Sequence, residues 1–96
     1  MLTMAVEIPK EQVPLLKFPT DEVLPAVDDR NERSRIIHQA TALGNLEKHK
    51  VVIVFSDFEG VKKVHTTIWA QTDRKVVLKG GVHIPVNRIH YVNVTP

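Results

Sequence analysis

The sequence predicts a mainly β domain with one N-terminal helix, preceded by an extended leader. Apolar, β-branched runs separated by turn residues recur through residues 50–95, which is typical of consecutive strands. A helical apolar period occurs before them, over about residues 30–43. Four prolines interrupt residues 1–29 and disfavour helix there. The 96 residues fit one domain, made of a leader (residues 1–29) and a helix-plus-β body (residues 30–96).

The leader is predicted to be extended or irregular, but it is more apolar than a disordered tail. We expect its second half to pack on the body or on a partner chain. The candidate partner-binding residues are Leu15, Leu16, Phe18 and Leu24. They favour a protein–protein interaction or self-assembly module, which is the alternative to the function described below.

The helix has sequence signals at both ends. Asp29 is the predicted N-cap, with Glu32 completing a capping-box-like pair. Gly44-Asn45 supplies a left-handed stop. Between these signals the apolar residues that recur at helical spacing are Ile36, Ile37, Ala40 and Leu43.

Five strands are expected after the helix. Residues 51–55 are apolar on both faces, which predicts a central or doubly covered strand that ends in a hairpin at Ser56–Gly60. Residues 63–71 alternate strictly and predict one strand with a core face and a solvent face. Residues 76–78 and 82–85 flank the Gly80-Gly81 turn, and Pro85 ends the second of these strands. A 3₁₀ turn over residues 85–88 then leads into the last strand, residues 89–94.

This order of elements resembles that of the SH3-like and Sm-like small β-barrel proteins. The features that carry the resemblance are the helix before the first strand, the hairpin at Asp57–Gly60, and the segment Lys79–Pro85 leading into Ile89. The resemblance implies a small five-stranded antiparallel barrel. It also implies a nucleotide pocket near the glycine-containing turn and assembly into rings through the last strands.

Charge is distributed unevenly along the chain. Residues 1–32 carry three basic and seven acidic residues, a net charge of −4, whereas residues 33–96 carry ten basic and four acidic residues, a net charge of +6. Two interpretations remain open: the basic body binds an anionic partner, or the acidic leader lies back on the body.

The solvent face of the strand over residues 63–71 is the candidate nucleic-acid site. Trp69 lies among basic residues there, and an exposed tryptophan can stack a base while cations meet phosphate. The alternative is that the helix or the leader covers Trp69. The proposed nucleic-acid-binding residues are Lys63, His65, Trp69, Lys79, His83 and Arg88.

Catalytic and metal chemistry find no support in the sequence. There is no cysteine, no nucleotide-binding glycine loop and no nucleophile motif. The five histidines lack the spacing of zinc ligands. We therefore expect a non-enzymatic protein without catalytic residues, metal or cofactor.

The chain carries no sign of a membrane or an export route. No stretch approaches the roughly 20 apolar residues of a membrane span, and Glu7 follows a start without basic residues, unlike a signal peptide. The absence of cysteine fits a reducing compartment. We expect a cytoplasmic protein whose partner is RNA, single-stranded DNA or a second copy of the chain.

Overall fold

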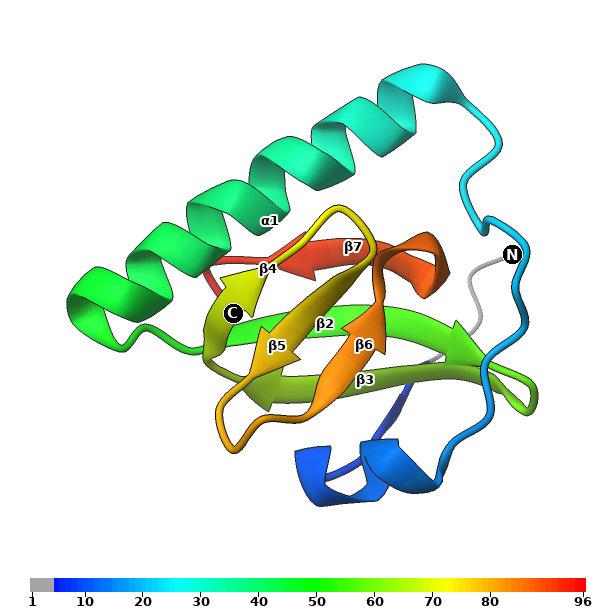
Figure 1. Cartoon of the computed structure of the whole chain (residues 1–96), viewed down its shortest axis with the longest axis horizontal. Coiled ribbons are helices and arrows are strands. Elements are labelled where there is room, and N and C mark those ends of the chain that lie inside the picture. The colour runs from blue at the N-terminus through cyan, green and yellow to red at the C-terminus, as the bar shows by residue number, and fades with distance from the viewer. Residues whose placement is uncertain (1–4) are drawn as a thin grey trace.

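The strands form two sheets, and one long helix runs beside them (Figure 1). The computed structural model describes residues 5–96; residues 1–4, which begin the predicted leader and the segment compared with a signal peptide, lie outside this range. The prediction of a mainly β fold with one α-helix is confirmed. One sheet has the strand order β1-β3-β2-β7, with β1 Val6–Glu7, β3 Gly60–Thr66, β2 Val51–Asp57 and β7 Ile89–Asn93. The other has the order β4-β5-β6, with β4 Ile68–Gln71, β5 Lys75–Leu78 and β6 His83–Pro85.

The first sheet is built on the predicted hairpin. β2 and β3 pair antiparallel from Val51↔Thr66 to Asp57↔Gly60. On its other edge β2 pairs with β7, so β2 is the central strand that its apolar sequence predicts. The Phe55 side chain on β2 is fully buried.

The prediction of one continuous strand over residues 63–71 is wrong. The chain leaves the first sheet after Thr66 and enters the second at Ile68. Thr66, Thr67 and Ile68 are buried in succession, which a strand with one solvent face does not allow. The alternation of the sequence therefore spans a bend between two sheets, and its two ends face different surroundings.

The end of the chain follows the predicted path. Gly80 (φ 90°) and Gly81 (φ 83°) form the turn between β5 and β6. Pro85 ends β6 and directly precedes the 3₁₀ helix η2 (Val86–Arg88), which leads into β7.

The helix α1 spans Val27–Glu47, longer at both ends than the predicted residues 30–43. Ala26, not Asp29, is the N-cap residue, and Asp29 lies in the first turn. Gly44 does not stop the helix, because its backbone packs directly against β4: a Cβ on Gly44 would overlap the backbone oxygen of Ile68. The left-handed residue that ends the helix is Lys48, with φ 54°. Gly44 is therefore a packing residue rather than a cap.

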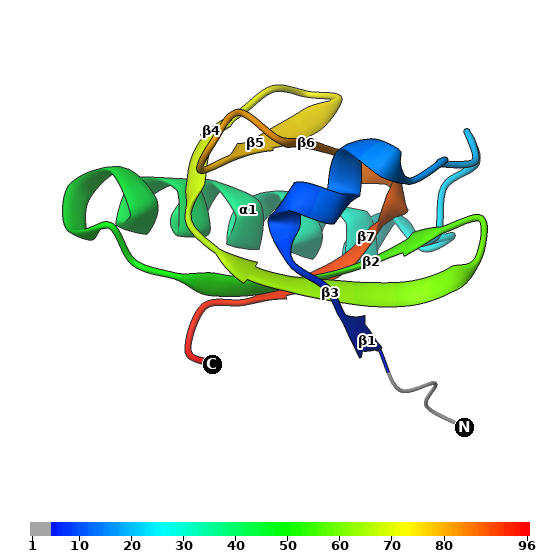
Figure 2. The same cartoon turned by 90° about the horizontal axis from the view of Figure 1, so that it is seen from below.

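Two helical segments pack along the edges between the two sheets. α1 packs against β4 and β7, and the 3₁₀ helix η1 (Lys10–Leu15) packs against β3 and β6. Figure 2 shows one sheet above the other, with η1 in front and α1 behind. Within residues 5–96 the strand pairing does not run continuously around the molecule as in a closed barrel. Side chains from helical segments thus complete the core.

The leader lies on the body of its own chain. Ile8 and Val13 belong to the buried core, and Leu16 and Phe18 pack against it. The Phe18 and Phe55 ring centroids are 6.0 Å apart. The expectation that the second half of the leader packs on the body is confirmed for Leu16 and Phe18, and the first half adds Ile8 and Val13.

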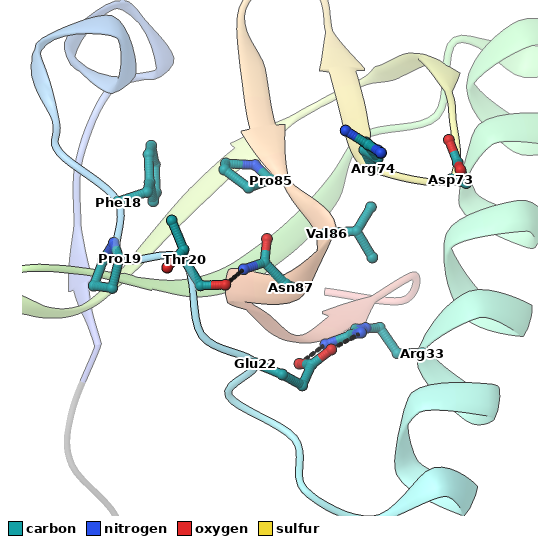
Figure 3. Close-up of a pocket in the computed structure, with 10 residues that line it drawn as sticks. All are labelled: Phe18, Pro19, Thr20, Glu22, Arg33, Asp73, Arg74, Pro85, Val86 and Asn87. Atoms are coloured by element: carbon teal, nitrogen blue, oxygen red, sulfur yellow. Dashed lines mark hydrogen bonds and ion pairs between the residues drawn. The ribbon is translucent and has the colours of Figure 1, made fainter.

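Acidic residues of the leader also meet basic residues of the body. Glu22 accepts two hydrogen bonds from the Arg33 guanidinium, at 2.6 Å and 2.7 Å (Figure 3). Arg33 is only 6% exposed and also donates to the Ile89 carbonyl. Asp21 pairs with Arg88, which is buried as well. Of the two interpretations of the charge asymmetry, the structure shows the leader folded back.

A third ion pair, between Asp57 and Lys62, makes stability depend on pH. The Asp57 carboxylate accepts from the Lys62 ammonium at 2.8 Å and 2.9 Å. Burial raises the pKa of Asp57, but the Lys62 hydrogen bond and the N–H groups of Glu59 and Gly60 outweigh it. The folded-state pKa lies below its ordinary value of 3.8.

This pair should therefore stabilise the fold above about pH 4, and its contribution should disappear as the pH falls through the lower folded-state pKa. In urea unfolding at pH 7 and at pH 3, Asp57→Asn should lose less stability on acidification than the wild type. Gln39→Ala, at an exposed and uncharged side chain, should keep the wild-type dependence. An unchanged dependence in Asp57→Asn would assign the acid sensitivity to other carboxylates.

Candidate nucleic-acid interface

Trp69 is turned outward by a break in the strand pairing. Ile68 pairs with Leu78 and Ala70 with Val77, so one extra residue of β4 stands between two pairs that are adjacent in β5. Trp69 is the extra residue of this β-bulge, and its side chain is 49% exposed. Bulges bend a strand and re-aim a side chain, and they are frequent beside functional sites. The side chain that the sequence analysis placed at the centre of the site is thus half accessible.

A hollow of about 380 Å³ lies beside Trp69. One wall is the last part of α1, and the other is the bend between the two sheets. Three lysines border it, from three places in the chain: the end of α1, the start of β2 and the end of β5. The lining residues are Gly44, Asn45, Lys48, Lys50, Thr67, Trp69 and Lys79.

Backbone geometry brings these lysines together. The left-handed Lys48 reverses the chain at the end of α1 and places Lys50 directly before β2. Lys79 donates its backbone N–H to the Thr67 carbonyl at 2.9 Å, which fixes the end of β5 against the bend. Among the described residues, none of the three ammonium groups forms an ion pair, so all three charges are available to a ligand.

The solvent face of β4-β5-β6 extends from this hollow. Ala70, Val77 and His83 are cross-strand neighbours and point to the same side. Lys75 follows on that side of β5, two residues from Val77. The opposite side carries the buried residues Val76, Leu78 and Ile84. We call the solvent side of these three strands, together with Trp69 and the three lysines, the basic face.

The structure separates the predicted site residues. Trp69, Lys79 and His83 lie on the basic face. Lys63 and His65 lie on β3 in the other sheet, and His65 points to solvent there.

The buried Arg88 side chain connects the leader with β2 through hydrogen bonds. Its guanidinium donates to the Ser56 carbonyl, the Asp21 carbonyl and the Asp21 carboxylate. Because Arg88 is buried and satisfied by these contacts, it lies away from the basic face.

The predicted partner-binding residues of the leader have different exposures. Leu16, Phe18 and Leu24 are partly buried on the body, whereas Leu15 remains exposed. Leu15 lies beside the exposed Phe58 at the hairpin tip, where both line a small hollow. Only part of the predicted partner-binding set is therefore accessible.

Lys48 and Lys50 were missed by the sequence analysis. The basic motif Lys48-His49-Lys50 could have indicated them, because it lies in the connection between the helix and the first long strand. The predicted helix ended at Leu43, which left these residues in a linker of unknown direction. The true end at Glu47 directs them toward Trp69.

His90 is the extra residue of a second bulge, in β7 opposite Val54 and Phe55. Its Nε2 lies 2.6 Å from the Ser56 hydroxyl oxygen. Burial and the charges of Arg88 and Arg33 lower the pKa of His90, so the neutral imidazole is favoured. Ser56 is buried within β2, so this pair is a structural contact rather than an accessible nucleophile and base.

The residues described contain no cluster of three or more histidine or acidic side chains that could hold a metal ion. Within the same range, α1 is too polar to cross a membrane, and no other helix has the length. Comparison of the chain with protein-family models, with curated proteins and with solved structures finds no match. The basic face is therefore the feature from which a function can be inferred.

Proposed function

We propose that this protein binds single-stranded nucleic acid, RNA or DNA, on the basic face and performs no catalytic step. The outward-turned Trp69, placed by a bulge among three unpaired lysines, is the observation that carries the proposal. An aromatic ring stacks any base, and lysines attract the phosphates without reading sequence. The expected binding is thus tolerant of sequence and sensitive to salt.

We also infer that the β part is a variant of the SH3-like and Sm-like small barrels. Support comes from the order of helix, hairpin, 3₁₀ turn and last strand, and from the pairing of that last strand with the first long one. In this variant, α1 and η1 fill the gaps between two sheets. A cytoplasmic location agrees with the absence of cysteine and with a nucleic-acid partner.

Replacing Trp69 with alanine should weaken binding of a fluorescently labelled uridine octamer, measured by anisotropy. Loss of one stacked base costs about 1–3 kcal/mol, which is roughly 5- to 150-fold in Kd. Tyr91→Ala is the matched control, because Tyr91 is 57% exposed but lies in the other sheet. Equal losses in the two variants, or no binding by the wild type at low salt, would refute the proposal.

The lysines should determine the salt dependence in the same assay. For single strands, each lysine that meets a phosphate contributes about 0.7 to the slope of log affinity against log salt. Lys50→Ala and Lys79→Ala should each reduce the slope by about this amount. Lys63→Ala should leave it unchanged, because Lys63 is on β3. A dominant effect of Lys63 would move the interface to the other sheet.

A further inference from the structure

A second cavity lies at the end of β5 opposite the hollow at Trp69. It is a cleft of about 470 Å³ between the leader, the β4–β5 turn and the segment after β6. This volume is within the range of small-ligand sites, about 300–1,000 Å³. Figure 3 shows Phe18 on one side of the cleft and Pro85, Val86 and Arg74 on the other. The cleft therefore combines apolar surfaces with two arginines, Arg33 and Arg74, and two carboxylates, Glu22 and Asp73.

The polar groups of the cleft leave a cation and an acceptor free for a ligand. Glu22 is held by Arg33, so its negative charge is matched within the wall. Arg74 is exposed, and its guanidinium forms no ion pair or hydrogen bond with any described residue. The Asn87 amide nitrogen donates to the Thr20 and Asp21 carbonyls. Its oxygen points away from Thr20 toward the space beside Pro85 (Figure 3).

Strand β5 connects the cleft with the hollow at Trp69. Arg74 directly precedes β5 and Lys79 directly follows it. Five residue steps at about 3.3 Å each place the two positions about 16 Å apart. A stacked single strand rises about 3.4 Å per nucleotide, so about five nucleotides span this distance, and fewer when the strand is extended. His83 and Lys75 lie between the two ends on the same side of the sheet.

We propose that the cleft is a second nucleotide subsite for the strand held at Trp69. In this arrangement a base packs between Phe18 and Pro85 and donates an N–H to the Asn87 amide oxygen, while Arg74 pairs with a phosphate. Unpaired bases are recognised through such edge contacts and stacking. This inference rests on the proposed function, because it extends the nucleic-acid strand bound at Trp69 along β5 to the cleft.

A length series tests the subsite separately from the site at Trp69. Trp69 is the only tryptophan of the chain, so quenching of its fluorescence reports binding at the hollow directly. A uridine trimer should quench Trp69 but not reach Arg74, whereas a uridine octamer should occupy both ends. In Arg74→Ala, octamer affinity at 50 mM salt should fall roughly fivefold and its salt slope by about 0.7, with trimer affinity unchanged. Lys63→Ala is the control for the loss of one positive charge.

The acidic neighbour gives the opposite change. Asp73 also lines the cleft and repels a phosphate placed at Arg74. Asp73→Asn should therefore tighten octamer binding and leave trimer binding as it is. If Arg74→Ala weakens the trimer and the octamer equally, or neither of them, the second subsite is wrong while the site at Trp69 stands. If neither oligonucleotide quenches Trp69, the proposed function itself fails.

Discussion

Gly44→Ala is expected to destabilise the protein by about 2 kcal/mol, although alanine is the better helix former. The added Cβ would overlap the backbone oxygen of Ile68 and come within 2.9 Å of Thr67 Cγ2. Backbone atoms of a strand cannot move aside without shifting α1 or β4. Such overpacking costs up to about 3 kcal/mol, and the higher helix propensity of alanine offsets about 1 kcal/mol of it. The melting temperature should fall by about 8–16 °C in a thermal unfolding scan.

Gln39→Ala provides the control on the same helix. Gln39 is exposed, so alanine there should change stability by less than about 0.5 kcal/mol. Because Gly44, Thr67 and Trp69 line one hollow, Gly44→Ala should also weaken nucleic-acid binding. A Gly44→Ala protein as stable as the wild type would mean that helix and strand lie farther apart than described.

Glu22→Gln is the second substitution with a large expected effect. It should lower the free energy of unfolding by about 2–3 kcal/mol, measured by urea unfolding. The substitution keeps the size of the side chain but removes the charge that balances the buried Arg33. An unbalanced buried charge costs about 3–5 kcal/mol, and we expect a value at or below the low end because the Glu22 side chain is 29% exposed. Apart from Glu22, the Arg33 guanidinium donates only to the Ile89 carbonyl, and its Nε has no hydrogen-bond partner among the described residues.

The pair Glu32–Arg35 on the same helix supplies the comparison. Its hydrogen-bond distances are similar, at 2.6 Å and 2.9 Å, but both side chains are about 60% exposed. Glu32→Gln should therefore cost much less stability than Glu22→Gln. Similar losses in Glu22→Gln and Glu32→Gln would show that burial of Arg33 is not what makes the leader contact strong.

Local patterns predicted most of the fold, because the forces that decide these elements act over a few residues. The β2–β3 hairpin, the Gly80-Gly81 turn and the end of β6 at Pro85 all follow from turn chemistry. The end of α1 did not, since Gly44 is required by contact with β4 rather than by its own helix. The bend at Thr67 was hidden for a similar reason: the alternation continues in the sequence while the sheet changes.

The candidate site was predicted in part. Trp69 and Lys79 were both in the predicted set, but Lys48 and Lys50 required the correct end of α1. Arg88 looked like a surface cation, and its burial depends on Asp21, which is 67 residues away in sequence. Long-range ion pairing leaves no periodic signal, so the contribution of the leader could be stated only as one of two alternatives.

The docked leader also has a consequence for biosynthesis. Its residues 5–26 are synthesised before Asn87 and Arg88, which hold Thr20 and Asp21. Ile8 and Val13 can be buried in the core only after β2, β3 and β6 have been synthesised. Elements so distant in sequence fold slowly and late. The leader is therefore expected to dock only after Asn87 and Arg88 have been synthesised.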